Sequence, residues 1–251
     1  MPNPFEDHFS QIAANYAQYR PQYPAALYEY LAEQAPGRAL ALDCATGSGQ
    51  AALGLVEHFD QVVATDASPE QIENAVRHER IIYRVEPAEA SSLAAGSVDL
   101  VTVAVGVHWF DHDRFYQEVR RVLRPGGVLA VWTYHRPVIT PALDRVIARL
   151  DGQILADYWP APLRFLQEHY RTLPFPFEEL SPPEFAIQTE WDRDQLLGFI
   201  SSWSAVRRYE KEQGDHPLRL VWDDFLSAWG AEDTRHAIHY PLYMRAGRVR
   251  G

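Results

Sequence analysis

The sequence lacks several features that would place it in a class at once. Cys44 is the only cysteine among 251 residues, so an internal disulfide is excluded and a reducing compartment is expected. Lys211 is the only lysine, and 34 acidic residues against 23 lysines and arginines give a net charge of -11. A polynucleotide-binding protein needs a basic surface to displace phosphate counterions, and no basic run occurs here. The charge pattern therefore predicts no nucleic-acid partner.

Long apolar stretches are also missing. No stretch approaches the ~20 residues that cross a bilayer. The first residues, Met1 to Ser10, carry acids and proline where a secretory signal has basic residues and an apolar core. We therefore expect a soluble, cytoplasmic protein with no membrane partner. Hydrophobic residues make up 47% of the chain, which is enough to build a substantial core.

Between Arg38 and about Tyr134, short apolar runs alternate with helix-like segments. The runs are nearly continuous in aliphatic and β-branched residues, as in parallel strands covered on both faces. This pattern predicts an open α/β sheet with crossover helices. The expected strands are Ala39–Asp43, Gln61–Asp66, Ile81–Val85, Val98–Val105 and Val128–Tyr134, and the expected helices are Gln50–Phe59, Pro69–His78 and Arg114–Leu123.

Local signals mark two boundaries within this region. Ser68 at the N-cap, Pro69 at the first helical position and Gln71 at the third predict a sharp helix start with reciprocal capping. The run Arg124–Gly127 predicts a turn into the fifth strand. After His135 prolines and tryptophans become frequent, which predicts a cap with helices over 162–173 and 194–209. Two further strands, Glu184–Trp191 and Ala237–Met244, are expected to return to the sheet.

The most informative stretch is Leu40–Gln50, where a strand runs into a turn of small residues and then a helix. Gly47 and Gly49 let the backbone approach a ligand closely, and the helix start offers amides to a negative group. The run Gly47–Ala52 also fits the dinucleotide pattern G-x-G-x-x-A, with Asp66 at the end of the next strand placed to bind a ribose. A nicotinamide-dependent oxidoreductase is therefore one candidate function.

Asp43 argues against a dinucleotide, because a carboxylate at the mouth of the first strand would face the pyrophosphate. An acid at this position favours a cationic ligand, and S-adenosylmethionine carries an ammonium and a sulfonium beside an adenosine. Asp43 would then meet the amino acid end and Asp66 the ribose. Two structural alternatives stay open at this point: Asp43 as a residue that caps the loop, and Asp66 as an ordinary turn residue.

Four motifs follow one another along the chain: Leu42–Gly49, Ala64–Pro69, Val98–Val101 and Arg121–Gly127. Their order and spacing resemble those of class I S-adenosylmethionine-dependent methyltransferases, over about residues 35–135. A narrower likeness, to a small-molecule branch that includes trans-aconitate methyltransferase-like enzymes, lies in Tyr16–Pro24 and Val107–Asp111. The resemblance implies a Rossmann-like fold with a mostly parallel seven-stranded sheet, helices on both faces and a helical cap.

The resemblance implies three regions and a set of cofactor residues. Residues 1–34 would form lid helices, 35–135 the cofactor-binding core, and 136–251 a cap and substrate region that includes the last two strands. S-adenosylmethionine would be the cofactor and S-adenosylhomocysteine the product. The implied roles are the methionine end for Ala45, Gly47 and Gly49, the ribose for Asp66, the adenine for Ala67, Ala88 and Glu89, the border of the methyl group for Val105, and a lid contact to the cofactor carboxylate for Arg20.

The chain departs from its relatives at two of these positions. Pro87 stands where many have an aspartate, so Glu89 is only a candidate for the adenine amine. Ala45 replaces a usual glycine, which is tolerated if its φ angle is negative. A third possibility is therefore a module that keeps the cofactor fold without turnover.

The acceptor is expected to be a small molecule that is methylated on a carboxylate or hydroxyl oxygen. The expected substrate-binding residues are His108 and Trp109, which follow the fourth strand, and Tyr134, which ends the fifth. His108 is also the candidate general base, although a carboxylate acceptor needs none. No metal site is expected, and the sequence does not predict the oligomeric state.

Overall fold

The computed structural model describes residues 22–249. Arg20 and most of the Tyr16–Pro24 motif therefore lie outside the described residues. The helices are α2 (Ala25–Gln34), α3 (Gln50–Leu55), α4 (Pro69–Asn74), α5 (His112–Val122), α6 (Pro141–Arg149), α7 (Arg164–Gln167), α8 (Arg193–Ser201), α9 (Ser204–Gln213) and α10 (Trp222–Trp229). The strands are β1 (Leu40–Cys44), β2 (Gln61–Asp66), β3 (Ile81–Val85), β4 (Val98–Ala104), β5 (Leu123–Thr133), β6 (Glu178–Glu179), β7 (Phe185–Trp191) and β8 (His236–Arg248).

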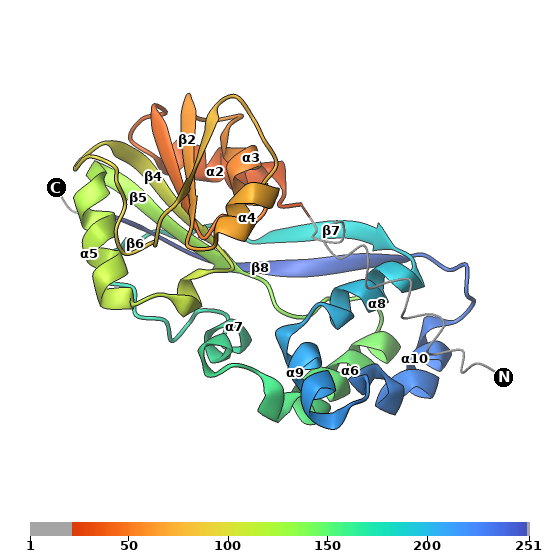
Figure 1. Cartoon of the computed structure of the whole chain (residues 1–251). Coiled ribbons are helices and arrows are strands. Elements are labelled where there is room, and N and C mark those ends of the chain that lie inside the picture. The colour runs from red at the N-terminus through yellow and green to blue at the C-terminus, as the bar shows by residue number, and fades with distance from the viewer. Residues whose placement is uncertain (1–21, 250–251) are drawn as a thin grey trace. The chain divides into compact units, whose positions relative to one another are not determined.

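The strands form a mixed sheet in the order β3-β2-β1-β4-β5-β8-β6, and β7 pairs with β8 (Figure 1). The pairs among β1 to β5 are parallel, whereas β8 runs antiparallel to β5 and β6. The chain order reverses between β1 and β4, which are neighbours in the sheet. In open α/β sheets ligands bind outside the carboxyl ends of the strands at such a switch point. The predicted Rossmann-like α/β fold is confirmed.

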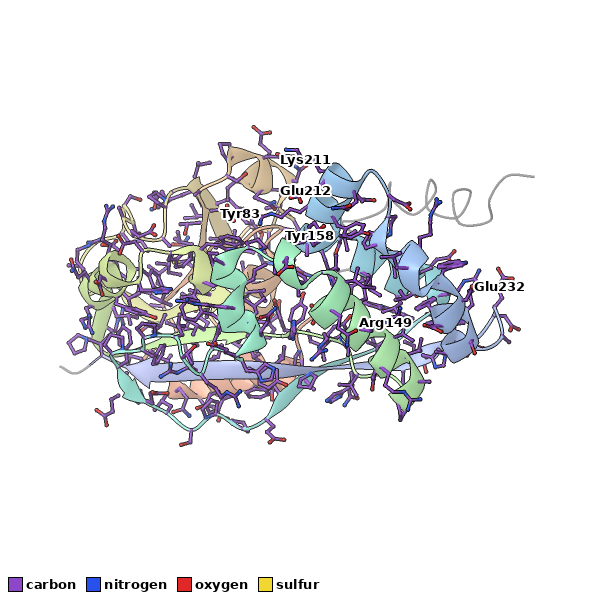
Figure 2. All side chains as sticks on the ribbon, turned by 90° about the horizontal axis from the view of Figure 1, so that it is seen from below. Tyr83, Arg149, Tyr158, Lys211, Glu212 and Glu232 are labelled. Carbon is purple, nitrogen blue, oxygen red and sulfur yellow. The ribbon has the colours of Figure 1, made fainter. Side chains whose placement is uncertain are left out.

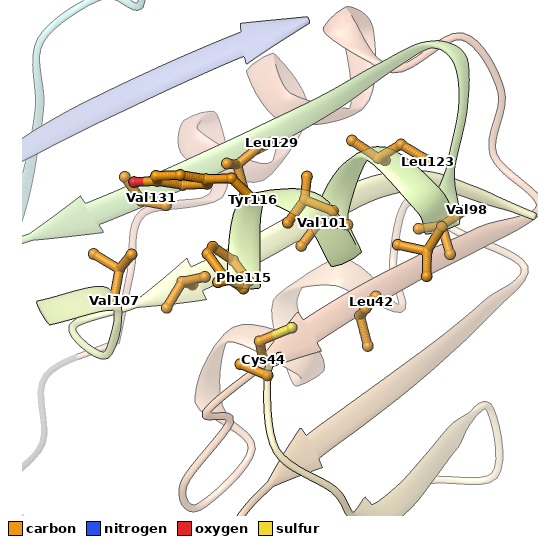
Figure 3. Packing of buried hydrophobic residues seen from close by; sticks show 14 of the residues in the cluster. Leu42, Cys44, Val98, Val101, Val107, Phe115, Tyr116, Leu123, Leu129 and Val131 are labelled. Atoms are coloured by element: carbon orange, nitrogen blue, oxygen red, sulfur yellow. The ribbon is translucent and has the colours of Figure 1, made fainter. Parts of the chain in front are cut away.

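Helix α5 covers one face of the parallel strands. Its Phe115 and Tyr116 pack with Leu42 and Cys44 of β1 in a buried cluster that extends over β4 and β5 (Figure 3). On β1 the side chains alternate, so Ala41 and Asp43 point to the opposite face. Helix α3 contacts both β1 and β2, and α2 contacts α3. Both faces of the central strands are thereby covered, which explains their continuous apolar character.

The chain divides into two compact units, which are described separately. The sheet unit contains Gln22–His135, Phe165–Ala186 and residues 241–249, and the helical unit contains Arg136–Arg164 and Ile187–Tyr240. In the helical unit Arg149, labelled in Figure 2, belongs to α6. Its Nη1 lies 2.7 Å from Asp224 Oδ2 and joins α6 to α10. No helix between residues 22 and 249 combines the length and apolar character that a bilayer crossing requires.

Several boundaries differ from the sequence prediction. The Arg124–Gly127 run does not precede β5 but lies within it, because Gly126 has a φ of 76° and the β4–β5 register shifts there. The expected helix over 162–173 contains only a single turn of 3-10 helix and the short α7. The expected helix over 194–209 is two helices, α8 and α9. At Ser68 the hydroxyl accepts from Gln71 N, which is the serine half of the predicted reciprocal cap.

Candidate functional site

The small-residue turn after β1 has three left-handed residues in five positions. The φ angles are 51° at Ala45, 54° at Gly47 and 86° at Gly49. Thr46 N donates to Thr65 O and Gly49 N donates to Thr46 O, both at 2.9 Å, so the turn is fixed against β2 and closed on itself. The condition for tolerating Ala45, a negative φ angle, is not met, because the backbone there is left-handed despite the Cβ atom, at a cost of roughly 1–2 kcal/mol.

Asp43 lies behind this turn rather than at its open side. Its carboxylate is 0% exposed and accepts hydrogen bonds from Thr46 Oγ1 at 2.6 Å and from Thr102 Oγ1 at 2.8 Å. Burial raises the pKa of Asp43 to about 6, against the lowering effect of these hydroxyls. The sequence predicts that Asp43 contacts a cationic ligand directly. In the structure its side chain points to the covered face of the sheet and offers no surface to a ligand. Its bonds instead join the turn to β4.

Asp66 stands where β2 ends, beside the same turn. Its Oδ2 accepts from Gly47 N at 3.0 Å and its Oδ1 accepts from Ser68 N at 2.9 Å. The side chain is half-buried. A carboxylate offers about four acceptor positions, so two remain after the two amides are bound. Ala67, next in sequence, is exposed. The geometry brings Asp66, Ala67 and the glycine turn together.

The loop after β3 carries Ala88 and Glu89. Ala88 is buried in the α5 cluster and has little surface for a ligand, while Glu89 Oε1 accepts from Asp111 N at 3.0 Å. Glu86 N donates to Asp66 O, which places the start of this loop against the end of β2. The carboxylate of Glu89 is thus already engaged with the start of α5.

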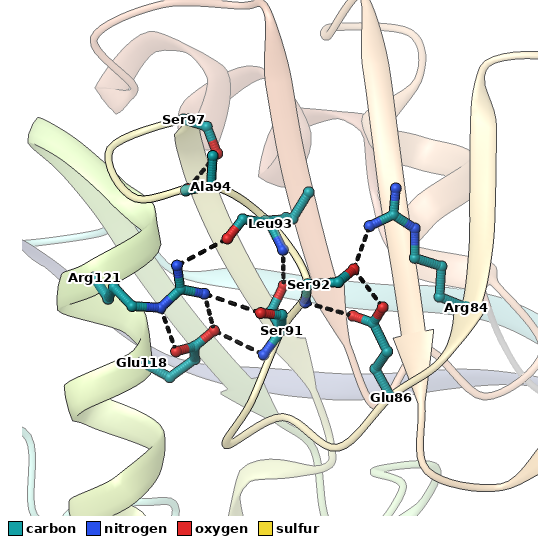
Figure 4. A network of polar contacts seen from close by, with 9 residues as sticks. All are labelled: Arg84, Glu86, Ser91, Ser92, Leu93, Ala94, Ser97, Glu118 and Arg121. Atoms are coloured by element: carbon teal, nitrogen blue, oxygen red, sulfur yellow. Dashed lines mark hydrogen bonds and ion pairs between the residues drawn. The ribbon is translucent and has the colours of Figure 1, made fainter.

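Charged groups on both sides hold this loop (Figure 4). Glu118 of α5 accepts from Ser91 N at 2.7 Å and pairs with Arg121, whose guanidinium also donates to two carbonyls of the loop. On the other side Glu86 accepts from the amide and the hydroxyl of Ser92. The backbone groups of the loop are therefore held by side chains of α5 on one side and by Glu86 on the other.

The end of β4 approaches the glycine turn closely. Val105 has a φ of 56°, which is unusual for a β-branched residue, and its N–H donates to Trp132 O at 2.9 Å. A Cβ atom on Gly106 would lie 2.9 Å from Ala45 Cβ, so only glycine fits there without a shift. The tips of β1 and β4 therefore meet at Ala45 and Gly106. Gly106 lies within the stretch Val105–Trp109 that the resemblance places at the methyl group, but the sequence gives this glycine no role of its own.

His108 follows in the short 3-10 helix η2 (Val107–Trp109) and is 4% exposed. Its Nδ1 lies 3.0 Å from the hydroxyl of Tyr170, a residue that sequence inspection missed because nothing local connects positions so far apart. Burial, and secondly the neighbouring His112, lower the pKa of His108 to about 4. The imidazole is therefore neutral at physiological pH and a weak proton acceptor.

The other two expected substrate residues differ from His108 in exposure. Trp109 is 56% exposed, and its ring centroid lies 5.0 Å from that of His108. Tyr134 is half-buried just beyond β5, and its carbonyl accepts from Thr133 Oγ1. In residues 22–249 no group of three or more histidine, cysteine, aspartate or glutamate side chains is arranged to hold a metal ion.

The residues at this edge fit an adenosine-type ligand better than a pyrophosphate. Asp66 presents acceptor positions to hydroxyl donors, and exposed Ala67 lies beside it. The backbone at Gly106 approaches the glycine turn so closely that a Cβ atom does not fit between them without a shift. Asp43 accepts a hydrogen bond from Thr46 and Asp66 accepts one from Gly47, so two carboxylates contact neighbouring residues of the same turn. Their negative charges disfavour a ligand that carries several negative charges itself.

Comparisons with known proteins agree with this geometry. Residues 42–131 match the family profile of a methyltransferase domain. A Dictyostelium discoideum protein whose name describes it as a methyltransferase is 31% identical over 97% of this chain and 95% of its own length. An uncharacterized methyltransferase of Mycobacterium tuberculosis is 34% identical over 64% of this chain and 68% of its own. A structure from Anaeromyxobacter dehalogenans, described as a type II methyltransferase, has a TM-score of 0.87 and 44% identity, covering 92% of this chain and 98% of that one.

Proposed function

The chain belongs to the class I S-adenosylmethionine-dependent methyltransferases, and on that premise we propose that it methylates an oxygen atom of a small-molecule acceptor. S-adenosylmethionine supplies an activated methyl group, which an oxygen nucleophile takes while the sulfur keeps the bonding electron pair and leaves as S-adenosylhomocysteine. The protein's task is then to align the reactants and exclude water, which contributes roughly 7–11 kcal/mol to lowering such a barrier.

The placement of Asp66 is the observation that carries the proposed cofactor site. Its carboxylate lies between Gly47 N and Ser68 N and keeps acceptor positions for the two ribose hydroxyls. In this proposal Ala45, Gly47 and Gly49 surround the methionine end, and Ala67 contacts the adenine. Asp43 acts as a positioning residue, since its bonds to Thr46 and Thr102 hold the turn in place.

The remaining proposed cofactor positions follow from the loops around Asp66. Ala88 shapes the adenine side from within the core, and Glu89 binds the adenine amine through the acceptor positions that its bond to Asp111 N leaves. Val105 borders the methyl group at the end of β4. Arg20 stays a proposed lid contact to the cofactor carboxylate.

The preference for oxygen rests on the chemistry available near β4. An ionised carboxylate needs no general base, whereas an amine must lose a proton during the reaction. His108, with a pKa of about 4, is poorly matched to remove one near neutral pH. We therefore propose His108, Trp109 and Tyr134 as acceptor-binding residues and a carboxylate as the preferred acceptor.

The larger context of the reaction is part of the same proposal. Residues 136–251 would form the cap and substrate region that selects the acceptor, and residues 1–34 the lid. The Val107–Asp111 motif supports membership of the trans-aconitate methyltransferase-like branch. The acidic composition and single cysteine support a cytoplasmic location.

Calorimetry on an Asp66 variant tests the cofactor site. We expect Asp66→Ala to weaken S-adenosylmethionine binding at least about tenfold, because two ribose hydrogen bonds to a charged group are lost. Asp60→Ala is the matched control, since Asp60 is exposed at the opposite end of the same strand. Equal affinities of the two variants would remove Asp66 from the site, and binding of NAD in place of S-adenosylmethionine would reject the proposed function.

A turnover assay tests the acceptor class. Release of S-adenosylhomocysteine is measured with panels of carboxylates, phenols and amines at equal concentration. We expect the carboxylates to react fastest. Turnover confined to amines would contradict O-methylation, and cofactor binding without any turnover would indicate a silent module of this fold.

A further inference from the structure

A buried polar contact joins the residues that follow β4 to Tyr170. His108 Nδ1 lies 3.0 Å from Tyr170 Oη. Tyr170 comes from the Phe165–Ala186 segment, which belongs to the sheet unit. It is 0% exposed and packs in the α5 cluster. None of the roles assigned above explains why this hydroxyl is buried against His108.

The backbone that carries Tyr170 is strained. His169 and Tyr170 have φ angles of 55° and 57°, and two consecutive left-handed residues other than glycine are rare. Several contacts hold them in place: the His169 ring stacks on Tyr243 at 3.6 Å, and Arg245 Nη1 donates to the carbonyls of Tyr170 and Leu173. Strain that the surroundings compensate at one point is typical of functional sites.

The protons of this pair follow from its chemistry. Burial raises the pKa of Tyr170, so the phenol keeps its proton, and His108 is neutral. A phenol is a strong donor and a weak acceptor, whereas the unprotonated nitrogen of an imidazole is a strong acceptor. This difference in acceptor strength favours donation from Tyr170 to Nδ1, which would place the single ring proton of His108 on Nε2.

The other ring nitrogen of His108, Nε2, is exposed to solvent and not used by the described part of the chain. Among residues 22–249, Nε2 forms no hydrogen bond, and it is not one of the buried polar atoms that lack a partner, so it reaches accessible surface. The residue follows Val105 and Gly106, whose approach to Ala45 fixes the tip of β4. An N–H donor is thus available beside the proposed site.

We propose that Tyr170 is a positioning residue that holds His108 in the Nε2–H tautomer, so that this N–H donates to a carboxylate oxygen of the methyl acceptor. The inference rests on the proposed function and makes it more specific. A carboxylate has a second oxygen that accepts this hydrogen bond while the first is methylated. A protonated amine has no such acceptor and would be rejected.

Removal of one hydroxyl tests the role of Tyr170. Tyr170→Phe keeps the ring and removes the donor, and Tyr116→Phe is the matched control because Tyr116 is buried in the same cluster and donates to Pro174 O instead. We expect Tyr170→Phe to lower kcat/KM about tenfold for benzoate or for the fastest carboxylate of the panel, with unchanged S-adenosylmethionine affinity. Tyr116→Phe should change kcat/KM less than about twofold.

The tautomer is measured without turnover. Long-range ¹H–¹⁵N spectra of the histidine rings, assigned through a His108→Gln variant, should show Nε2–H in the wild type and in Tyr116→Phe but a mixture of tautomers in Tyr170→Phe. His108→Gln, which places an amide nitrogen near the Nε2 position, should retain more activity than His108→Asn, which places it near Nδ1.

The outcomes separate the two proposals. An Nδ1–H tautomer in the wild type, or equal kcat/KM for the two phenylalanine variants in an active enzyme, overturns the role of Tyr170 and leaves the proposed function intact. A protein that binds no S-adenosylmethionine overturns the proposed function and, with it, the donation to an acceptor, whereas the spectra still decide the tautomer.

Discussion

Replacing Gly49 with alanine tests how tightly β3 closes over the glycine turn. Gly49 has a φ of 86°, and a Cβ atom on it would lie 2.4 Å from Tyr83 Oη and 3.3 Å from Tyr83 Cζ. The tyrosine cannot simply swing away, because its hydroxyl donates to Val76 O at 2.6 Å and Val76 N donates to Ser48 O at 3.2 Å. Two separate effects are therefore expected, left-handed strain and a collision with an anchored side chain.

The magnitudes follow from these two effects. Left-handed strain on alanine costs about 1 kcal/mol, and overpacking against an anchored group costs about 2 kcal/mol, so Gly49→Ala should destabilise the protein by roughly 3 kcal/mol. Tyr83→Phe alone loses one hydrogen bond, about 1 kcal/mol. In the double variant the hydroxyl is gone and the contact at 3.3 Å is accommodated by a small shift of the ring. We therefore expect a total near 2 kcal/mol rather than the additive 4 kcal/mol, a coupling of about 2 kcal/mol.

Urea unfolding at equal m-values measures all three free energies. Gly126→Ala is the control for strain alone, since Gly126 has a φ of 76° but the nearest atom to its Cβ position, in Pro36, is 4.0 Å away. It should cost only about 1 kcal/mol. Additivity of Gly49→Ala and Tyr83→Phe within about 0.5 kcal/mol would refute the collision. Equal costs at Gly49 and Gly126 would do the same.

Two further predictions concern buried charge. Arg124→Met should destabilise the protein by about 3–5 kcal/mol in urea unfolding, because Asp99 is 0% exposed and would lose the guanidinium that lies 2.9 Å from its Oδ1; a loss below about 1 kcal/mol would contradict this. Because the pKa of His108 is about 4 in the folded protein against 6.5 for an ordinary histidine, the unfolded chain binds the proton first. The folded state should therefore lose stability as pH falls from 6.5 towards 4, by roughly 3 kcal/mol in all, and His108→Gln should remove that part of the slope. Parallel stability curves for the wild type and His108→Gln over this range would show that His108 is not buried as a neutral ring.

The parts of the fold that sequence predicts well are those whose signal is local. The bounds Gln61–Asp66 and Ile81–Val85 agree with β2 and β3, because each strand is a short run of β-branched residues between turns. The cap at Ser68 is also local, since the hydroxyl and the amide it binds lie three positions apart. Asp66 follows from both, because the end of β2 and the start of α4 fix where its carboxylate stands.

The errors occur where a distant segment decides the conformation. Side chains alternate along a strand, so the sequence of β1 alone indicates that Leu42 and Asp43 point to opposite faces of the sheet. Which of these faces is open to a ligand depends on α3, which packs on the face that carries Asp43. Thr102 becomes its partner through the parallel register, in which Asp43 lies opposite Thr102. β5 starts at Leu123 because Gly126, with its positive φ angle, lets the chain shift its register against β4. The sequence of β5 alone does not predict this shift.

The strained residues explain why the geometry of the candidate site is not predicted from the sequence. Within residues 22–249 the left-handed residues other than glycine are Ala45, Val105, His169 and Tyr170. None is an asparagine, aspartate or glycine, so composition gives no warning of their conformation. Two follow the adjacent strands β1 and β4, and the other two bring the Tyr170 hydroxyl to His108. Since each conformation persists only when its surroundings impose it, strain at the sheet's carboxyl edge indicates that packing there fixes the position of functional groups at the expense of stability.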